Sequence, residues 1–252
     1  MPPRPDLTID VRVEALVADS LSFPLPSPIL RGQYEDKSTL ARRWKGMTEK
    51  VEVVLFYGHA LNEDYACFSN FYVHEPFTFK IPPWCGLYAD QDTVPIHFAE
   101  KAIMLCKASL MGDEVLFSEI SQATTPIEAK RLGRKVQPWN ETKWQSRVCN
   151  IAGHVTTAKF TSNEHFAEEL LNTKGRLIAE ASPRDKLWGI GMGSKNPLAS
   201  FPSQWKGVNV LGWALMTTRE KLIHARHDIE IRKQYSEECS ANSAVATCER
   251  VE

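Results

Sequence analysis

Two charged residues lie within the apolar stripe of a predicted helix. Residues 95–111 carry apolar side chains at helical spacing, and Glu100 and Lys107 fall inside that apolar arc instead of on the solvent face. They are two turns apart, about 10 Å along the axis, and the lysine is predicted to lean back toward the glutamate. Because such charges cost free energy unless they are paired or used, the pattern indicates either a polar active-site face or a buried ion pair.

The chemistry open to this pair is acid–base or nucleophilic. Apolar surroundings raise the pKa of a carboxyl group such as Glu100, and an ammonium on Lys107 would lower it again. Glu100 is therefore the first candidate for proton transfer. Lys107 is an electrostatic partner, a salt-bridge partner only, or, if desolvation leaves its amine neutral, a nucleophile that forms a Schiff base.

A second group of candidates lies between residues 180 and 191. Asp185 follows a proline-containing turn and precedes a glycine loop, a usual place for a ligand-contacting acid, although an Asx-type turn is the alternative. Glu180 ends a short predicted strand, where it binds a sugar hydroxyl or caps a loop. Trp188 fits a stacking platform or the core. Gly189 and Gly191 permit close backbone approach to a phosphate.

Two further pairs suit the ends of a nucleotide-like ligand. Lys130 and Arg134 are one helical turn apart and either bind a phosphate or form a solvated basic face. Asn70 and Phe71 suit an amide-plus-aromatic contact to a base, with loop packing as the alternative.

Composition narrows the class of protein. The chain has 252 residues, 43% hydrophobic and 24% charged, which is typical of a soluble globular protein. A net charge of −1 gives no bulk attraction for polyanions, so a nucleic-acid partner needs a local basic patch. Scattered cysteines, the lack of an apolar signal core and the lack of a run of about 18 apolar residues favour a cytoplasmic or nuclear protein with no membrane partner. The histidines show no metal-ligand spacing, and we expect no metal and no cofactor.

The sequence pattern predicts a helix-rich α+β domain with a few short strands. These elements must position the candidate residues. We expect an N-terminal leader at 1–50 with a short strand or helix at 10–20, a catalytic domain at 51–224, and a polar tail at 225–252 that is disordered at its end. Predicted strands cover 51–57, 77–81 and 177–181, and predicted helices cover 95–111, 125–133, 144–160, a segment capped by Asn163, and 210–222.

Several motifs in order resemble the NADAR superfamily, which is named for a proposed link to NAD and ADP-ribose. The resemblance runs from residue 56 to about 222. It comprises Phe56-Tyr57, Ser69-Asn70-Phe71, the Glu100 and Lys107 pair, residues 129–134 (AKRLGR), Trp144, Lys159-Phe160 with Asn163, Glu180 with Asp185 and Trp188-Gly189-Ile190-Gly191, and Gly207-x-Asn209-x-Leu211-Gly212 with Arg219.

The resemblance implies a single NADAR-type domain that hydrolyses N-glycosyl bonds. The favoured substrate is ADP-ribose joined to a guanine base, in DNA, RNA or a nucleotide. The alternatives are ribosylamino-pyrimidine intermediates of riboflavin biosynthesis and a non-catalytic module that binds ADP-ribose. It assigns catalysis to Glu100, Lys107 and Asp185, and substrate binding to Asn70, Phe71, Lys130, Arg134, Glu180, Trp188, Gly189, Gly191 and Asn209.

Overall fold

The computed structural model of the chain describes residues 36–87 and 93–248, with side chains as far as residue 234. The chain divides into two compact units, one spanning residues 34–222 and one made of the residues on either side of that range. Every candidate site residue belongs to the unit 34–222. The short element predicted at 10–20 lies outside the described residues.

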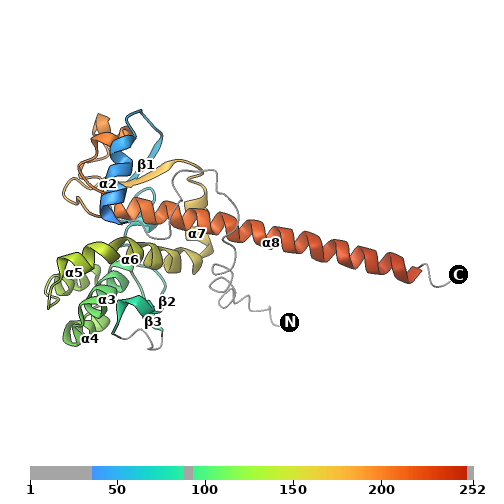
Figure 1. Cartoon of the computed structure of the whole chain (residues 1–252), viewed down its shortest axis with the longest axis horizontal. Coiled ribbons are helices and arrows are strands. Elements are labelled where there is room, and N and C mark those ends of the chain that lie inside the picture. Colours follow the sequence, from blue (N-terminus) through green and yellow to red (C-terminus); the bar gives the residue numbers. More distant parts are fainter. Residues whose placement is uncertain (1–35, 88–92, 249–252) are drawn as a thin grey trace. The chain divides into compact units, whose positions relative to one another are not determined.

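The unit 34–222 is a helix-rich α+β body with short strands, as predicted (Figure 1). Its helices are α2 (Lys37–Gly46), α3 (Ala99–Met111), α4 (Glu114–Gln122), α5 (Pro126–Gly133), α6 (Glu141–Thr161), α7 (Glu164–Leu171) and the start of α8 (Val210–Cys248). Its strands are β1 (Val53–Phe56), β2 (Phe77–Phe79), β3 (Val94–Ile96) and β4 (Leu177–Glu180). Short 3-10 turns lie at Ala66–Phe68, Pro83–Cys85, Pro197–Ser200 and Pro202–Gln204.

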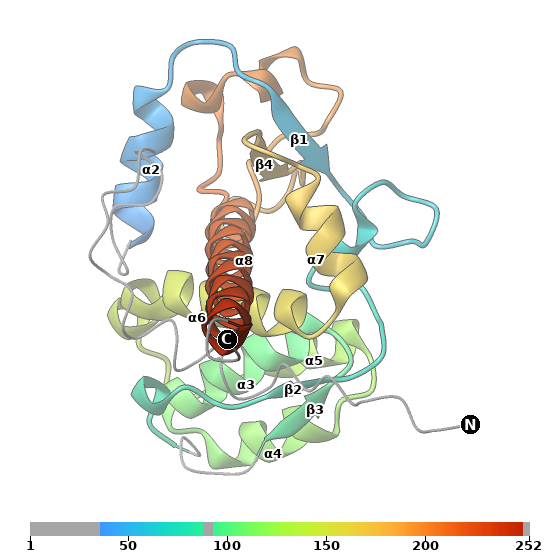
Figure 2. The same ribbon diagram turned by 90° about the vertical axis from the view of Figure 1, so that its right-hand side faces the viewer.

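The strands form two separate pairs. β1 and β4 are parallel, with Phe56 opposite Glu180, and the chain continues this pairing as Ala181 N–H donates to the Phe56 carbonyl at 2.7 Å (Figure 2). β2 and β3 are antiparallel. The parallel pair places Glu180 at the carboxyl end of its strand, the end at which ligands bind in open parallel sheets.

Helix α3 is buried on nearly all sides, and Lys107 is its one residue that is not fully buried. It contacts α4, α5 and α6. Our prediction that the helix starts at residue 95 was wrong, because residues 94–96 pair with β2 as strand β3. No side chain caps the first turn of α3. Instead, Glu100 N–H donates to the Asn70 carbonyl at 2.9 Å, which fixes Glu100 against the loop of residues 69–71.

Two predicted helix starts are confirmed by their caps, and a third helix begins earlier than predicted. The Thr125 hydroxyl accepts from Glu128 N–H in α5, whose first residue is Pro126, and Asn163 accepts from Phe166 N–H in α7. Asn140 caps α6, which therefore begins three residues before the predicted start.

The structure differs from the sequence prediction at both ends and in one internal helix. Residues 37–46 of the leader form α2, whose Trp44 is buried and donates from Nε1 to the Val208 carbonyl at 2.6 Å. Helix α8 continues to Cys248 where we predicted a disordered tail, because residues 223–248 contain neither glycine nor proline to stop it. Helix α4 was not predicted. Within the described residues, no helix combines the length and apolar character needed to cross a bilayer.

Candidate active site

Three carboxyl groups from separate elements lie within electrostatic range of one another. Glu100 comes from the first turn of α3, Glu180 from the end of β4, and Asp185 from the loop that follows. Burial raises the pKa of Glu100 to about 7, with Asp185 adding to the increase and the cations of Lys130, Arg134 and Lys107 opposing it. The sequence predicted this shift for Glu100.

The pKa of the Glu180 carboxyl group is raised in the same way. Burial raises its pKa to about 7, and the charges of Asp185 and Glu100 raise it further, while Lys130 opposes them. Its Oε2 is buried and has no hydrogen-bond partner in the described part of the chain. A buried acceptor without a partner is uncommon, and it leaves this oxygen available to a hydroxyl of a ligand. Both glutamates therefore have pKa values near neutral pH.

Asn209 holds Glu180 in place. Its side chain accepts from Glu180 N–H at 3.2 Å and donates to the Ile178 carbonyl at 2.9 Å, and the residue is fully buried. These contacts use both ends of the amide, so Asn209 orients β4, and the ligand contact that the resemblance implied for it stays a prediction.

Asp185 has a structural and an electrostatic role. Its Oδ1 accepts from the backbone N–H groups of Leu187 and Trp188 at 3.0 and 2.8 Å, which is the Asx-type turn weighed as the alternative. Its charge nevertheless acts on both glutamates. The half-buried Trp188 is positioned by this same turn.

The glycines of the 189–191 loop are required by packing. A Cβ on Gly189 would lie 2.7 Å from the Glu180 carbonyl oxygen. Gly191 has φ +69°, and a Cβ there would lie 3.0 Å from Cβ of Lys206. Protein atoms thus occupy the space beside both glycines, where the sequence suggested a phosphate.

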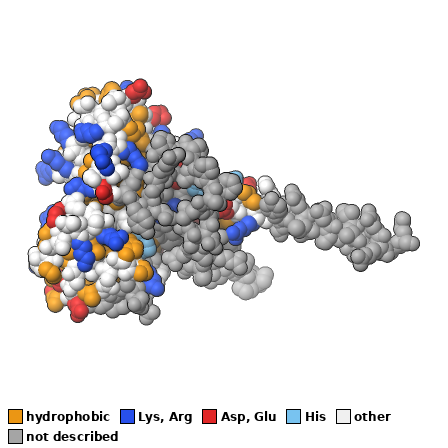
Figure 3. Space-filling model, in the orientation of Figure 1, with side chains coloured by type: hydrophobic (Ala, Val, Ile, Leu, Met, Phe, Trp, Pro, Cys, Tyr) orange, Lys and Arg blue, Asp and Glu red, His pale blue; other side chains and the backbone are white. Residues whose placement is uncertain are grey.

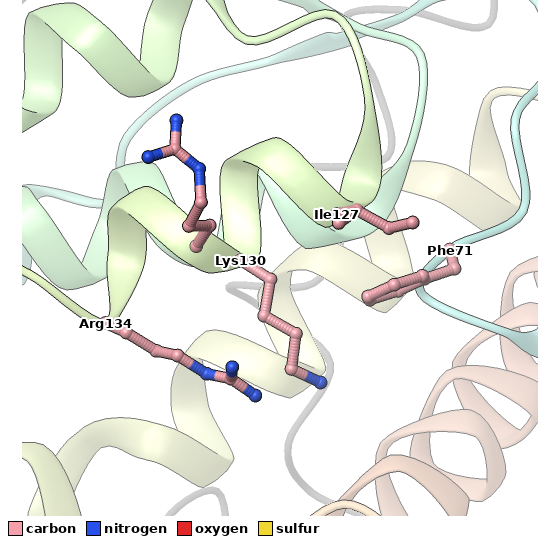
Figure 4. Close-up of a pocket in the computed structure, with 5 residues that line it drawn as sticks. Phe71, Ile127, Lys130 and Arg134 are labelled. Atoms are coloured by element: carbon pink, nitrogen blue, oxygen red, sulfur yellow. The ribbon is translucent and has the colours of Figure 1, made fainter.

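The cations predicted to bind phosphate lie on α5, facing the carboxyl groups. Lys130 is the strongest opposing charge on Glu100, and Arg134 is one turn further along the helix. Both side chains extend from the same side of α5 in Figure 4. They line an open pocket of about 350 Å³ together with Phe71, Ile127 and Arg131. The Lys130 Nζ lies 5.1 Å from the centre of the Phe71 ring, so an aromatic and a cationic surface are combined there.

Lys107, predicted to lean back toward Glu100, is hydrogen-bonded to the end of α5, and Glu100 exerts the largest effect of any charge on its pKa. Its Nζ donates to the Gly133 carbonyl at the end of α5 at 2.7 Å and lies 4.5 Å from the centre of the Trp139 ring and 5.6 Å from that of Trp144. Burial lowers the pKa of Lys107, and the charge of Glu100 opposes this shift. Lys107 therefore remains in the electrostatic field of the site, held by α5 and two indole rings.

The sequence analysis did not identify how the loop of residues 69–71 is held. Lys159 is buried in α6 and donates to the Cys67 and Ser69 carbonyls at 2.5 and 3.0 Å. Asn70, itself buried, then receives Glu100 N–H on its carbonyl. The sequence did contain one indication of this role, because Lys159 is a charged residue on the apolar face of the predicted helix 144–160.

The described residues contain no group of three or more His, Cys, Asp or Glu side chains arranged to hold a metal ion. The arrangement combines a buried and a half-buried carboxyl group, both of raised pKa, with cations at α5. Such a site suits cleavage of a glycosidic bond in a phosphorylated substrate, because one carboxyl group can donate a proton while another stabilises positive charge at the anomeric carbon.

The comparisons with known proteins agree with this class. The NADAR domain model matches residues 55–223, and the chain belongs to this family. It is 37% identical over 123 residues to N-glycosidase R617 of Acanthamoeba polyphaga mimivirus, covering 49% of this chain and 72% of that protein. It is 33% identical to protein irg-1 of Caenorhabditis elegans, over 67% of this chain and 79% of that one. The NMR structure of YbiA from E. coli shares the fold, with a TM-score of 0.52 at 24% identity, covering 71% of this chain and 89% of that chain.

Proposed function

We propose that this protein is an N-glycosidase that releases ADP-ribose from a modified guanine base. The observation that carries the proposal is that the buried Glu100 and the half-buried Glu180 both have pKa values of about 7 within range of the Lys130 charge. The name of the R617 relative supports the reaction type.

The pair can supply both charges that the reaction needs. Because each pKa is about 7, each glutamate is present in both its protonated and its ionised form near neutral pH. The protonated group donates to the departing nitrogen of the base, and the carboxylate stabilises the oxocarbenium-like carbon. Glu100 is our candidate for the proton-transfer group. The unpartnered Oε2 of Glu180 is available to a sugar hydroxyl.

Two nucleophiles are compatible with this geometry. Water can attack the anomeric carbon directly. Alternatively, the amine of Lys107, whose pKa is lowered by burial, can form the new bond as the base leaves, open the sugar to a Schiff base and be released by water.

A diphosphate and a nucleic acid both fit the charges around the site. Lys130, Arg131 and Arg134 lie on one wall. The loop between β4 and α8 adds the exposed Arg184, Lys186 and Lys206. Figure 3 shows Lys and Arg side chains prominent on one face of the molecule. The three cations at α5 and the three in the loop between β4 and α8 would supply the local basic surface that a protein of net charge −1 needs to bind a polyanion.

The test is incubation of the purified full chain with three substrates, followed by mass spectrometry. These are an oligonucleotide carrying ADP-ribosylated guanine, free NAD, and a phosphorylated ribosylamino-pyrimidine. We expect ADP-ribose release from the first. Release of ribose 5-phosphate from the third alone would instead support the riboflavin-pathway activity. Binding of ADP-ribose without release from any substrate would indicate a non-catalytic module.

A further inference from the structure

Trp139 is an exposed aromatic residue beside the candidate site that none of the sequence motifs includes. Its side chain is 39% exposed, and it follows α5 by a few residues. Its Nε1 donates to Glu141 Oε2 at 3.1 Å, and its backbone N–H donates to the Gln137 side chain at 3.1 Å. The indole ring is therefore fixed in position while much of its surface stays open to solvent.

The ring is connected to the site through Lys107. Lys107 Nζ lies over the Trp139 ring at 4.5 Å, and Lys107 also interacts electrostatically with Glu100 and Arg134. A group bonded to a carbon near Lys107 and Glu100 would therefore lie next to this indole.

A second aromatic ring lies at the other end of α5. Phe71 lies beside Ile127 and Lys130, in the N-terminal half of the helix (Figure 4), whereas Trp139 lies beyond its last residue, Gly133. The eight residues of α5 span about 12 Å. Lys130 belongs to α5 and Arg134 follows its last residue, each ring has a lysine ammonium over its face, and both rings are at least partly open to solvent.

We propose that Trp139 is a substrate-positioning residue that stacks the leaving base, while Phe71 and the α5 cations hold the nucleoside diphosphate. This rests on the proposed function and deepens it. The site then binds two flat heterocycles joined through a negatively charged linker. Stacking on an aromatic ring accepts any base, because every base presents a π-face.

This arrangement separates the two ends of the substrate, so it predicts different effects for the two rings. Trp139→Ala should raise KM for the ADP-ribosylated guanine oligonucleotide about 10- to 100-fold. It should leave the affinity for free ADP-ribose unchanged. Phe71→Ala should weaken binding of free ADP-ribose by a similar factor. Trp139→Phe should restore most of the KM, since it retains a ring.

Trp84→Ala is the matched control, because Trp84 has the Arg147 guanidinium 5.5 Å from its ring and was not placed in the site. A direct readout is indole fluorescence titrated with GMP, which we expect to quench in wild type and in Trp84→Phe but not in Trp139→Phe. The inference is overturned if wild type releases ADP-ribose while Trp139→Ala behaves like Trp84→Ala, or if Trp139→Ala weakens ADP-ribose binding as much as Phe71→Ala does. Absence of release by wild type from every substrate would contradict the proposed function itself, whereas the GMP titration reports on Trp139 independently of turnover.

Discussion

Two clusters of charged residues in the interior of this protein differ in how far protein groups hydrogen-bond their polar atoms. Around Lys159 the charge is fully satisfied, since its ammonium donates to two carbonyls and lies within 6 Å of the rings of Tyr72, Phe160 and Phe166. Around Glu100 and Glu180 the carboxyl groups repel one another, and one oxygen has no partner among the described residues.

Both clusters shift pKa values, yet only one is suited to catalysis. Burial lowers the pKa of Lys159 to about 8, but its contacts are all to the protein. The glutamates have pKa values of about 7, and Oε2 of Glu180 has no hydrogen-bond partner among the described residues. A perturbed pKa therefore marks a functional group here only where the group has capacity left for a ligand.

The largest expected effect is on the rate, from Glu100→Gln. The amide keeps the shape of the acid but cannot transfer its proton, so kcat should fall about 10²- to 10⁴-fold. Affinity for ADP-ribose should change little, and the melting temperature at pH 7 should not fall, because the pKa of Glu100 is also raised in the folded state. The measurement is single-turnover release of ADP-ribose. Activity within a few-fold of wild type would remove Glu100 from proton transfer.

Lys107→Arg tests whether the lysine acts through its amine or its charge. Arginine keeps a cation over Trp139 but cannot form a Schiff base, so the covalent route predicts a loss of at least about 100-fold. Borohydride added during turnover should then trap an ADP-ribose adduct on Lys107 in the wild-type protein, detected by peptide mass spectrometry. If the arginine variant is active and no adduct forms, Lys107 acts through its charge alone.

Lys159→Met should act on stability rather than on chemistry. It leaves the Cys67 and Ser69 carbonyls without their donor, which should lower the free energy of unfolding by about 2–3 kcal/mol. Urea denaturation measures this, with Lys143→Met as the control, because Lys143 lies exposed on the same helix. Unchanged stability together with lost turnover would show that Lys159 takes part in the reaction. The Lys159 cluster would then be functional and not only structural.

Glu180→Gln should change stability in a pH-dependent way. The folded-state pKa of about 7 exceeds the ordinary value of 4.5, so the folded state binds the proton more tightly and stability falls as pH rises between these values. The amide escapes that loss. We therefore expect the variant to be more stable than wild type by roughly 1–2 kcal/mol at pH 8 and to show no such gain at pH 4. Equal differences at both pH values in urea denaturation would show that Glu180 is not held protonated.

Helix starts and helix faces could be predicted because they depend on residues that are close together in the sequence. Thr125, Asn163 and Pro126 occupy the helix starts where their side chains were expected, because capping depends on residues three positions apart. Glu100 was identified as a buried carboxyl group because the apolar positions around it recur with the period of a helix. Lys130 and Arg134 were placed on one side of a helix by the same periodicity.

The remaining features depend on contacts between distant segments. Helix α3 begins at Ala99 because residues 94–96 pair with β2, and Lys107 turns toward Gly133 because α5 offers a carbonyl that the sequence of α3 does not reveal. Gly189, Gly191 and Asn209 serve loop and strand packing, which no spacing rule distinguishes from ligand binding. The sequence alone determined which residues could carry charge into the interior. Tertiary packing decided which of those charges were satisfied by protein groups and which were left for a substrate, since desolvation and hydrogen bonding depend on neighbours brought together only by the fold.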